Sequence, residues 1–191
     1  MHIVSYIVLA LAFGICDMLL FERCSAAVRV RLSRGLLCAL CVAAVHALLF
    51  LGGAALGNLF RIEGVDAPHL FDRANCWIFF GLALFVAVRL VFPYLRREPR
   101  LPLFDLSRAA SVAAMAVASG VNVLLVGVGV GFADALLRGH ACFWPVLVAC
   151  FLLGYLGLMF GRQAVALRPR RWAALASLAL LGVAVAALLA L

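Results

Sequence analysis

The sequence lacks lysine and contains few charged residues of either sign. Its 16 basic residues are all arginine, eight residues are acidic, and charged residues make up 13% of the chain. Hydrophobic residues make up 68%, and the mean hydropathy is +1.20. A water-soluble domain needs a polar and charged surface, so this composition excludes one and indicates a chain that is solvated by lipid.

Three further absences exclude other classes of protein. The chain has no nucleotide-binding glycine loop and no soluble stretch to carry one, so we expect no ATP hydrolysis within it and no enzymatic cofactor. The arginines lack the interleaved aromatic residues and the soluble platform of a nucleic-acid-binding surface. No arginine precedes the first apolar run, whereas a cleaved signal peptide begins with positive charge. We therefore expect a retained first helix.

Six apolar stretches are each long enough to cross a membrane, which takes roughly 20 residues. They cover residues of about 3–21, 36–57, 75–95, 108–132, 142–161 and 172–191. The sequence therefore predicts an all-α integral membrane protein with six transmembrane helices, in a single membrane domain over residues 1–191.

The arginines gather in alternate connections between these stretches. Four follow the first stretch, five lie between the third and fourth stretches or within their facing ends, and four lie between the fifth and sixth, whereas three lie elsewhere. Cytoplasmic connections carry an excess of positive charge. We therefore expect these three connections in the cytoplasm and both termini outside, with lipid as the surrounding partner.

The chain also contains an internal repeat. The segment 10–17 aligns without a gap with the segment 116–123, which places Gly14 on Gly120 and Cys16 on Asn122. A duplicated unit with an odd number of spans inserts its second copy upside down, as in many secondary transporters. We therefore predict two inverted three-helix repeats, of about 3–95 and 108–191, and expect the first span to pack beside the fourth with Gly14 and Gly120 in contact.

Four polar residues lie deep in the predicted spans. A polar group in hydrocarbon must be satisfied by another helix, by water or by a ligand, and an unpaired carboxylate costs several kcal/mol. We therefore predict that these residues converge on a transported divalent cation, although His46 alone also fits a hydrogen-bonded structural group. The candidate metal ligands are Asp17, Asn122, His46 and Cys16.

A second cysteine pattern has two interpretations. Cys38 and Cys41 are three residues apart on one helical face, which suits a redox pair or a zinc site. Cysteine in an apolar helix also acts as a small packing residue, and no second pair completes the four-ligand site that zinc prefers.

The chain resembles the MntP-type manganese efflux pumps, six-span bacterial proteins within the lysine-exporter-like transporter group. The family's first and fourth spans carry segments similar to 10–17 and 116–123, and its last third is similar to 156–162 and 180–183. The opening of the third span at Trp77 and Ile78 also matches. The resemblance implies six spans in a bacterial inner membrane, manganese efflux rather than an enzymatic reaction, and a manganese-type divalent cation as substrate.

The chain departs from this family at residues that would bind the ion. The family's two membrane-embedded aspartates fall on Cys16 and Asn122, with Asp17 one position late, and His46 stands where the family has Gln or Glu. Manganese favours carboxylate, carbonyl and water oxygens, so such a site is softer than manganese prefers. Either the selectivity has moved, or Asp17 rotates in by about 100° to supply the acid. Loss of transport and export of a small organic solute remain alternatives.

Overall fold

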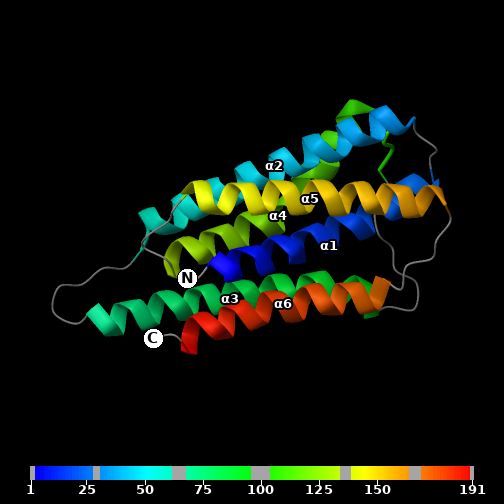
Figure 1. Ribbon diagram of the computed structural model, residues 1–191. Coiled ribbons are helices and arrows are strands. Elements are labelled where there is room, and N and C mark those ends of the chain that lie inside the picture. Colours follow the sequence, from blue (N-terminus) through cyan, green and yellow to red (C-terminus); the bar gives the residue numbers. More distant parts are fainter. Residues whose placement is uncertain are drawn as a thin grey trace.

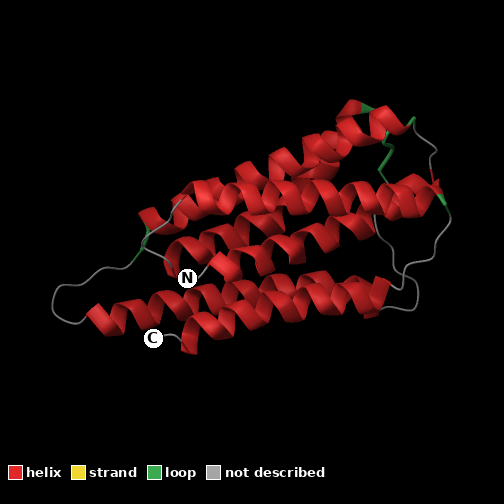
Figure 2. Ribbon diagram, in the orientation of Figure 1, coloured by secondary structure: helices red, strands yellow, loops and turns green. Residues whose placement is uncertain are grey.

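A computed structural model of the chain describes residues 3–27, 31–61, 68–95, 104–133, 139–163 and 169–189. It contains the six predicted helices, and no strand occurs in these ranges (Figures 1 and 2). The helices are α1 (Ile3–Ala27), α2 (Leu32–Leu59), α3 (Pro68–Leu95), α4 (Ala109–Ala133), α5 (Gly139–Arg162) and α6 (Pro169–Leu189).

Each helix is long and apolar enough to span a membrane. Long hydrophobic side chains cover the outside of the bundle, among them Leu37, Phe85 and Leu178, each more than half exposed. Such a surface would be unstable in water but suits lipid, because lipid tails are as apolar as these side chains. The predicted multi-pass membrane fold is confirmed.

The helices alternate in direction, so the helix ends that border the arginine-rich stretches of sequence lie together at one end of the bundle. This is the end where α1, α3 and α5 finish and α2, α4 and α6 begin, on the right in Figure 1. Both labelled termini lie toward the other end. We call the first end the arginine-rich end.

The packing partners form a regular pattern. α1 packs against α5 and α6, α4 packs against α2 and α3, and the remaining neighbours are α2 with α5 and α3 with α6. Exchanging α1 with α4, α2 with α5 and α3 with α6 reproduces the same set of neighbours. This is what two repeats of three helices would produce.

Glycine contacts repeat residue by residue in the two halves. A Cβ atom at Gly53 would collide with the carbonyl oxygen of Leu124 in α4, and one at Gly157 would collide with that of Met18 in α1. Gly157 follows Gly53 by 104 positions, and Leu124 follows Met18 by 106. Two helix pairs therefore approach closely in the same way, with the backbone contact that small residues permit.

The expected contact between Gly14 and Gly120 is wrong. Gly14 lies against Ala149 and Leu153 of α5, and Gly120 lies against His46 and Leu49 of α2. The two glycines occupy equivalent positions, because Leu153 follows Leu49 by 104 positions and Gly120 follows Gly14 by 106. Similar sequence indicates a similar place in each repeat, and here that place faces the other half's middle helix.

Candidate cation site

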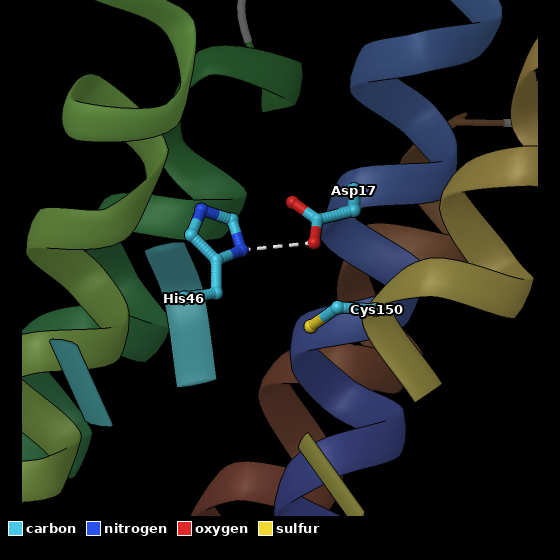
Figure 3. Close-up of side chains that lie close together, drawn as sticks. All are labelled: Asp17, His46 and Cys150. Carbon is cyan, nitrogen blue, oxygen red and sulfur yellow. Dashed lines mark hydrogen bonds and ion pairs between the residues drawn. The ribbon is translucent and has the colours of Figure 1, made fainter. Parts of the chain in front are cut away.

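Asp17 of α1 is enclosed within the helix bundle. Its side chain is 1% exposed, in the middle of a span, and it faces His46 of α2, which is also 1% exposed. The Nδ1 atom of His46 lies 2.9 Å from Oδ2 of Asp17 (Figure 3). The carboxylate therefore points into the protein and toward a nitrogen ligand, away from lipid and from the headgroups.

The second ring nitrogen of His46 is held by α4. Its Nε2 atom lies 2.9 Å from the hydroxyl oxygen of Ser119, and that hydroxyl donates to the carbonyl oxygen of Met115 at 2.8 Å. We assign the ring proton to Nε2, because a hydroxyl that donates to Met115 accepts from the imidazole. Nδ1 then faces Oδ2 of Asp17 at hydrogen-bond distance, so the pair holds a second hydrogen between these two atoms, and a cation that binds both groups must displace it.

Cys150 of α5 completes a group of three possible metal ligands. The ligand atoms of Asp17, His46 and Cys150 all lie within 4.8 Å of one another, and all three residues are buried. Figure 3 shows the three side chains converging from three helices. Oxygen, nitrogen and sulfur are thereby brought together inside an apolar bundle.

A cavity of about 240 Å³ lies beside this group. Ser119 lines it and also contacts His46, so the cavity and the Asp17–His46 pair share one residue. Since one water molecule takes up roughly 30 Å³ of liquid, the cavity has room for a partly hydrated ion. Its lining residues are Cys16, Leu19, Leu20, Arg89, Leu90, Pro93, Phe104, Met115, Ala118, Ser119, Asn122 and Ala173.

The cavity extends from the arginine-rich end to the middle of the bundle. Pro93 lies near the end of α3, and Phe104 lies in the connection before α4, whereas Asn122 lies halfway along α4. The Oδ1 atom of Asn122 is buried and has no hydrogen-bond partner among the described residues. A buried acceptor of this kind is destabilising unless water or an ion satisfies it.

The structure divides the four predicted ligands into two pairs. Asp17 and His46 contact each other, whereas Cys16 and Asn122 line the neighbouring cavity. Successive residues of a helix point about 100° apart, which directs Cys16 to the cavity and Asp17 to α2. Asp17 therefore supplies the buried acid, although the family's aspartate aligns with Cys16.

Cys38 and Cys41 do not form a pair. The Sγ atom of Cys38 contacts the carbonyl oxygen of Leu106 at 3.8 Å, whereas Cys41 is exposed on the outside of the bundle. Neither cysteine belongs to the group of possible metal ligands found among the described residues. Their positions favour the packing interpretation.

Cys150 and Ser119 were missed by the sequence interpretation. Both are small residues in apolar helices and carry no distinctive local motif. A signal was present, however, because the 104-position offset between Gly53 and Gly157 also relates His46 to Cys150.

Six apolar helices that enclose a carboxylate, an imidazole and a thiol define a multi-pass membrane protein with a polar site inside its bundle. The chain belongs to the family Mntp, described as "Putative manganese efflux pump", which matches residues 29–188. This match covers α2 to α6 and leaves the segment with Asp17 outside it.

Curated relatives agree with the family match. Two proteins from strains of Dehalococcoides mccartyi, both named "Putative manganese efflux pump MntP", are 28% identical to the chain over 137 residues. The aligned part covers 71% of this chain and 68% of each relative. No solved structure matches the chain.

Proposed function

We propose that this protein exports a divalent cation of the manganese type across a bacterial inner membrane. The observation that carries the proposal is Asp17, a carboxylate that is 1% exposed in a membrane-spanning helix and lies 2.9 Å from His46. Ionisable groups inside membrane proteins are costly, and they mark ion pathways. The family description and the names of the relatives supply the direction and the class of ion.

The geometry supports cation binding over a packing role. A packing role would be served by apolar side chains, since replacing a buried ion pair with well-packed hydrophobic residues is often neutral or stabilising. A packing role also fails to explain why the Oδ1 atom of Asn122 has no partner among the described residues, and why a cavity adjoins this residue. Export of an organic solute is not favoured by the family match, and the buried acid suits a cation.

The proposed route begins at the arginine-rich end. The positive-inside rule places this end in the cytoplasm and both termini outside. A hydrated cation would enter the cavity, exchange water for the amide oxygen of Asn122, and then pass to Asp17 and His46. We infer that the two repeats, of about 3–95 and 108–191, then rearrange about the site, as in other transporters with inverted repeats.

Metal tolerance tests this proposal. An exporter-deficient bacterium would carry the wild-type chain, Asp17→Asn or Asp105→Asn at equal expression, and growth would be measured with increasing manganese, zinc, cobalt and nickel. Asp105 is a matched control, because hydrogen bonds from Ser107 lower its pKa and keep it ionised, yet it lies in the connection before α4. Asparagine at position 105 can still accept from the Ser107 amide.

We expect rescue by the wild type and by Asp105→Asn for at least one metal, and loss of rescue with Asp17→Asn. Two outcomes would overturn the proposal. One is failure of the inserted wild type to rescue with any of the metals, and the other is full rescue by Asp17→Asn.

A further inference from the structure

We propose that Cys150 is the third ligand of the site, and that Asp17, His46 and Cys150 together select a borderline transition-metal cation such as Zn²⁺ or Co²⁺ over Mn²⁺. This inference rests on the proposed function and specifies its substrate class. It differs from the expectation for the family, whose resemblance implies an oxygen-ligated site.

The positions of the three ligand atoms are close to those that such an ion needs. Zinc binds sulfur at about 2.3 Å and nitrogen or carboxylate oxygen at about 2.0–2.2 Å, in tetrahedral geometry. Tetrahedral bonds of these lengths hold ligand atoms about 3.3–3.8 Å apart. The atoms here lie within 4.8 Å of one another, so small side-chain rotations bring all three onto one ion.

Ser119 prepares His46 for this role. A histidine that binds a metal usually donates its other ring N–H to a fixed acceptor, which sets the tautomer and the ring orientation. Nε2 of His46 lies 2.9 Å from the Ser119 hydroxyl, and Nδ1 faces Asp17 and Cys150. Ser119 is therefore a positioning residue, and the imidazole presents the lone pair of Nδ1 to the site once the hydrogen shared with Asp17 has been displaced.

The chemistry of the ligands decides which ion they favour. Affinities of nitrogen, oxygen and sulfur sites rise from Mn²⁺ through Co²⁺ toward Cu²⁺, with Zn²⁺ also above Mn²⁺. Thiolate and imidazole strengthen this preference, whereas manganese is suited by carboxylate, carbonyl and water. On metal binding the thiol of Cys150 and the hydrogen-bonded pair of Asp17 and His46 each release one proton to water, because the thiolate, the carboxylate and the lone pair of Nδ1 are the ligands.

The repeat explains how the ligands meet. His46 and Cys150 occupy equivalent positions of α2 and α5, which pack against each other. Asp17 has no acidic equivalent, since the residue 106 positions later is Val123. Asp17 from one half, together with His46 and Cys150 from equivalent positions of the two halves, thus surrounds the point where the halves face each other. The fourth position stays open for water, which lets a transported ion leave.

Cobalt spectroscopy on the full-length protein in detergent tests the third ligand without depending on transport. A thiolate bound to Co²⁺ gives a sulfur-to-metal charge-transfer absorption in the near ultraviolet, which oxygen and nitrogen ligands do not give. Co²⁺ would be added to the wild type, to Cys150→Ser and to Cys76→Ser. Cys76 is a matched control, because it is a buried cysteine of α3 outside the three-ligand group.

We expect this absorption in the wild type and in Cys76→Ser, and its loss in Cys150→Ser. Stoichiometric Zn²⁺ should displace Co²⁺, whereas an excess of roughly 100-fold Mn²⁺ should not. Absence of the absorption in the wild type, its persistence in Cys150→Ser, or its displacement by Mn²⁺ would each overturn the inference.

Transport in proteoliposomes separates this inference from the proposed function. Uptake of Zn²⁺ and Mn²⁺ would be measured for the wild type and Cys150→Ser, and we expect the ratio of Zn²⁺ to Mn²⁺ transport to fall in the variant by at least about tenfold. A chain that transports Mn²⁺ in preference to Zn²⁺, with no change in Cys150→Ser, retains the proposed function and refutes the third ligand. A chain that binds Co²⁺ through Cys150 but transports no cation refutes the proposed function alone.

Discussion

His46 of α2 and Cys150 of α5 are equivalent residues of the two halves, and both reach the same buried carboxylate. Cys150 follows His46 by 104 positions, as Leu153 follows Leu49 in the glycine contacts. The ligand atoms of both residues lie within 4.8 Å of that of Asp17. If the two halves are repeats, as we propose, two of the proposed ligands stand at equivalent places, whereas the acid occurs in one half.

The hydroxyl of Ser119 should determine how strongly His46 binds a cation. Ser119→Ala removes the acceptor of the Nε2 proton, so the imidazole loses its fixed orientation. Loss of such an outer partner lowers metal affinity by roughly 10- to 100-fold. We expect the Co²⁺ dissociation constant to rise by this factor, measured by titration of the purified protein.

Ser177→Ala provides the control for this effect. Ser177 is also a buried hydroxyl that donates to a carbonyl four residues earlier, that of Ala173, but it packs between α6 and α3, away from the cation site. Its replacement should leave cobalt affinity unchanged. Equal affinities for Ser119→Ala and Ser177→Ala would show that Ser119 does not position His46.

The close helix contacts should be equally sensitive in the two halves. Gly157→Ala places a Cβ against the Met18 carbonyl, and Gly53→Ala places one against the Leu124 carbonyl. A backbone carbonyl cannot rotate aside, so the helices must separate, and overpacking of this kind costs about 1–3 kcal/mol. We expect similar losses of stability for both variants, measured by denaturant unfolding in detergent.

Gly81→Ala provides the matched control for these two substitutions. Nothing lies within 4 Å of a Cβ atom at Gly81 on the outside of α3. Alanine there should be neutral or stabilise the helix by up to about 1 kcal/mol. Losses restricted to one of Gly53→Ala and Gly157→Ala, or losses equal to that of Gly81→Ala, would contradict equivalent packing in the two halves.

The arginine distribution predicts that both ends of the chain face outward. A tag fused at the C-terminus should react with a membrane-impermeant reagent in intact cells. A tag between residues 96 and 100 should react only after the cells are opened. The reverse pattern would show that the arginine-rich end, with the mouth of the cavity, faces outward and that the proposed route begins on the wrong side.

Much of the fold was predictable because membrane helices obey simple constraints. Length and hydropathy locate all six helices, with α1 and α2 extending further toward the arginine-rich end than the apolar stretches indicated. Helix neighbours were harder to predict. The match of Gly14 with Gly120 established equivalent positions, but equivalence does not decide which face meets which helix, and both glycines contact the other half instead.

The site, like the fold, was predictable in part from the sequence. Asp17 and His46 were predictable because charged and polar residues are conspicuous in apolar spans, and the structure places them 2.9 Å apart. Cys150 resembles the packing cysteines around it, so local sequence could not distinguish it. Applying the repeat offset to His46 leads directly to Cys150, which shows that the repeat carried more information about the site than the local motifs did.

Asn122 combines a structural penalty with a role in the proposed cation pathway. Its Oδ1 atom is buried with no hydrogen-bond partner among the described residues, and Asn122 lines the cavity that adjoins the Asp17–His46 pair through Ser119. An unsatisfied buried acceptor destabilises a protein by about 1–3 kcal/mol. The protein should therefore become more stable if this oxygen is removed and its place is filled by an apolar group.

Asn122→Leu should raise stability and lower transport together. Leucine has the branched shape of asparagine but no acceptor, and its larger methyl groups can fill part of the adjoining cavity, so we expect unfolding in detergent to require up to about 1–3 kcal/mol more free energy. Metal export should fall, because an ion entering the cavity loses the oxygen that replaces its hydration water. Asn122→Asp keeps an oxygen at this position and should retain or raise transport, above all of manganese, which favours carboxylate.

A protein with Asn122→Leu that exports metal as well as the wild type would show that this oxygen does not contact the ion. A less stable Asn122→Leu protein would show that water already satisfies Oδ1, since removal of a satisfied acceptor brings no gain.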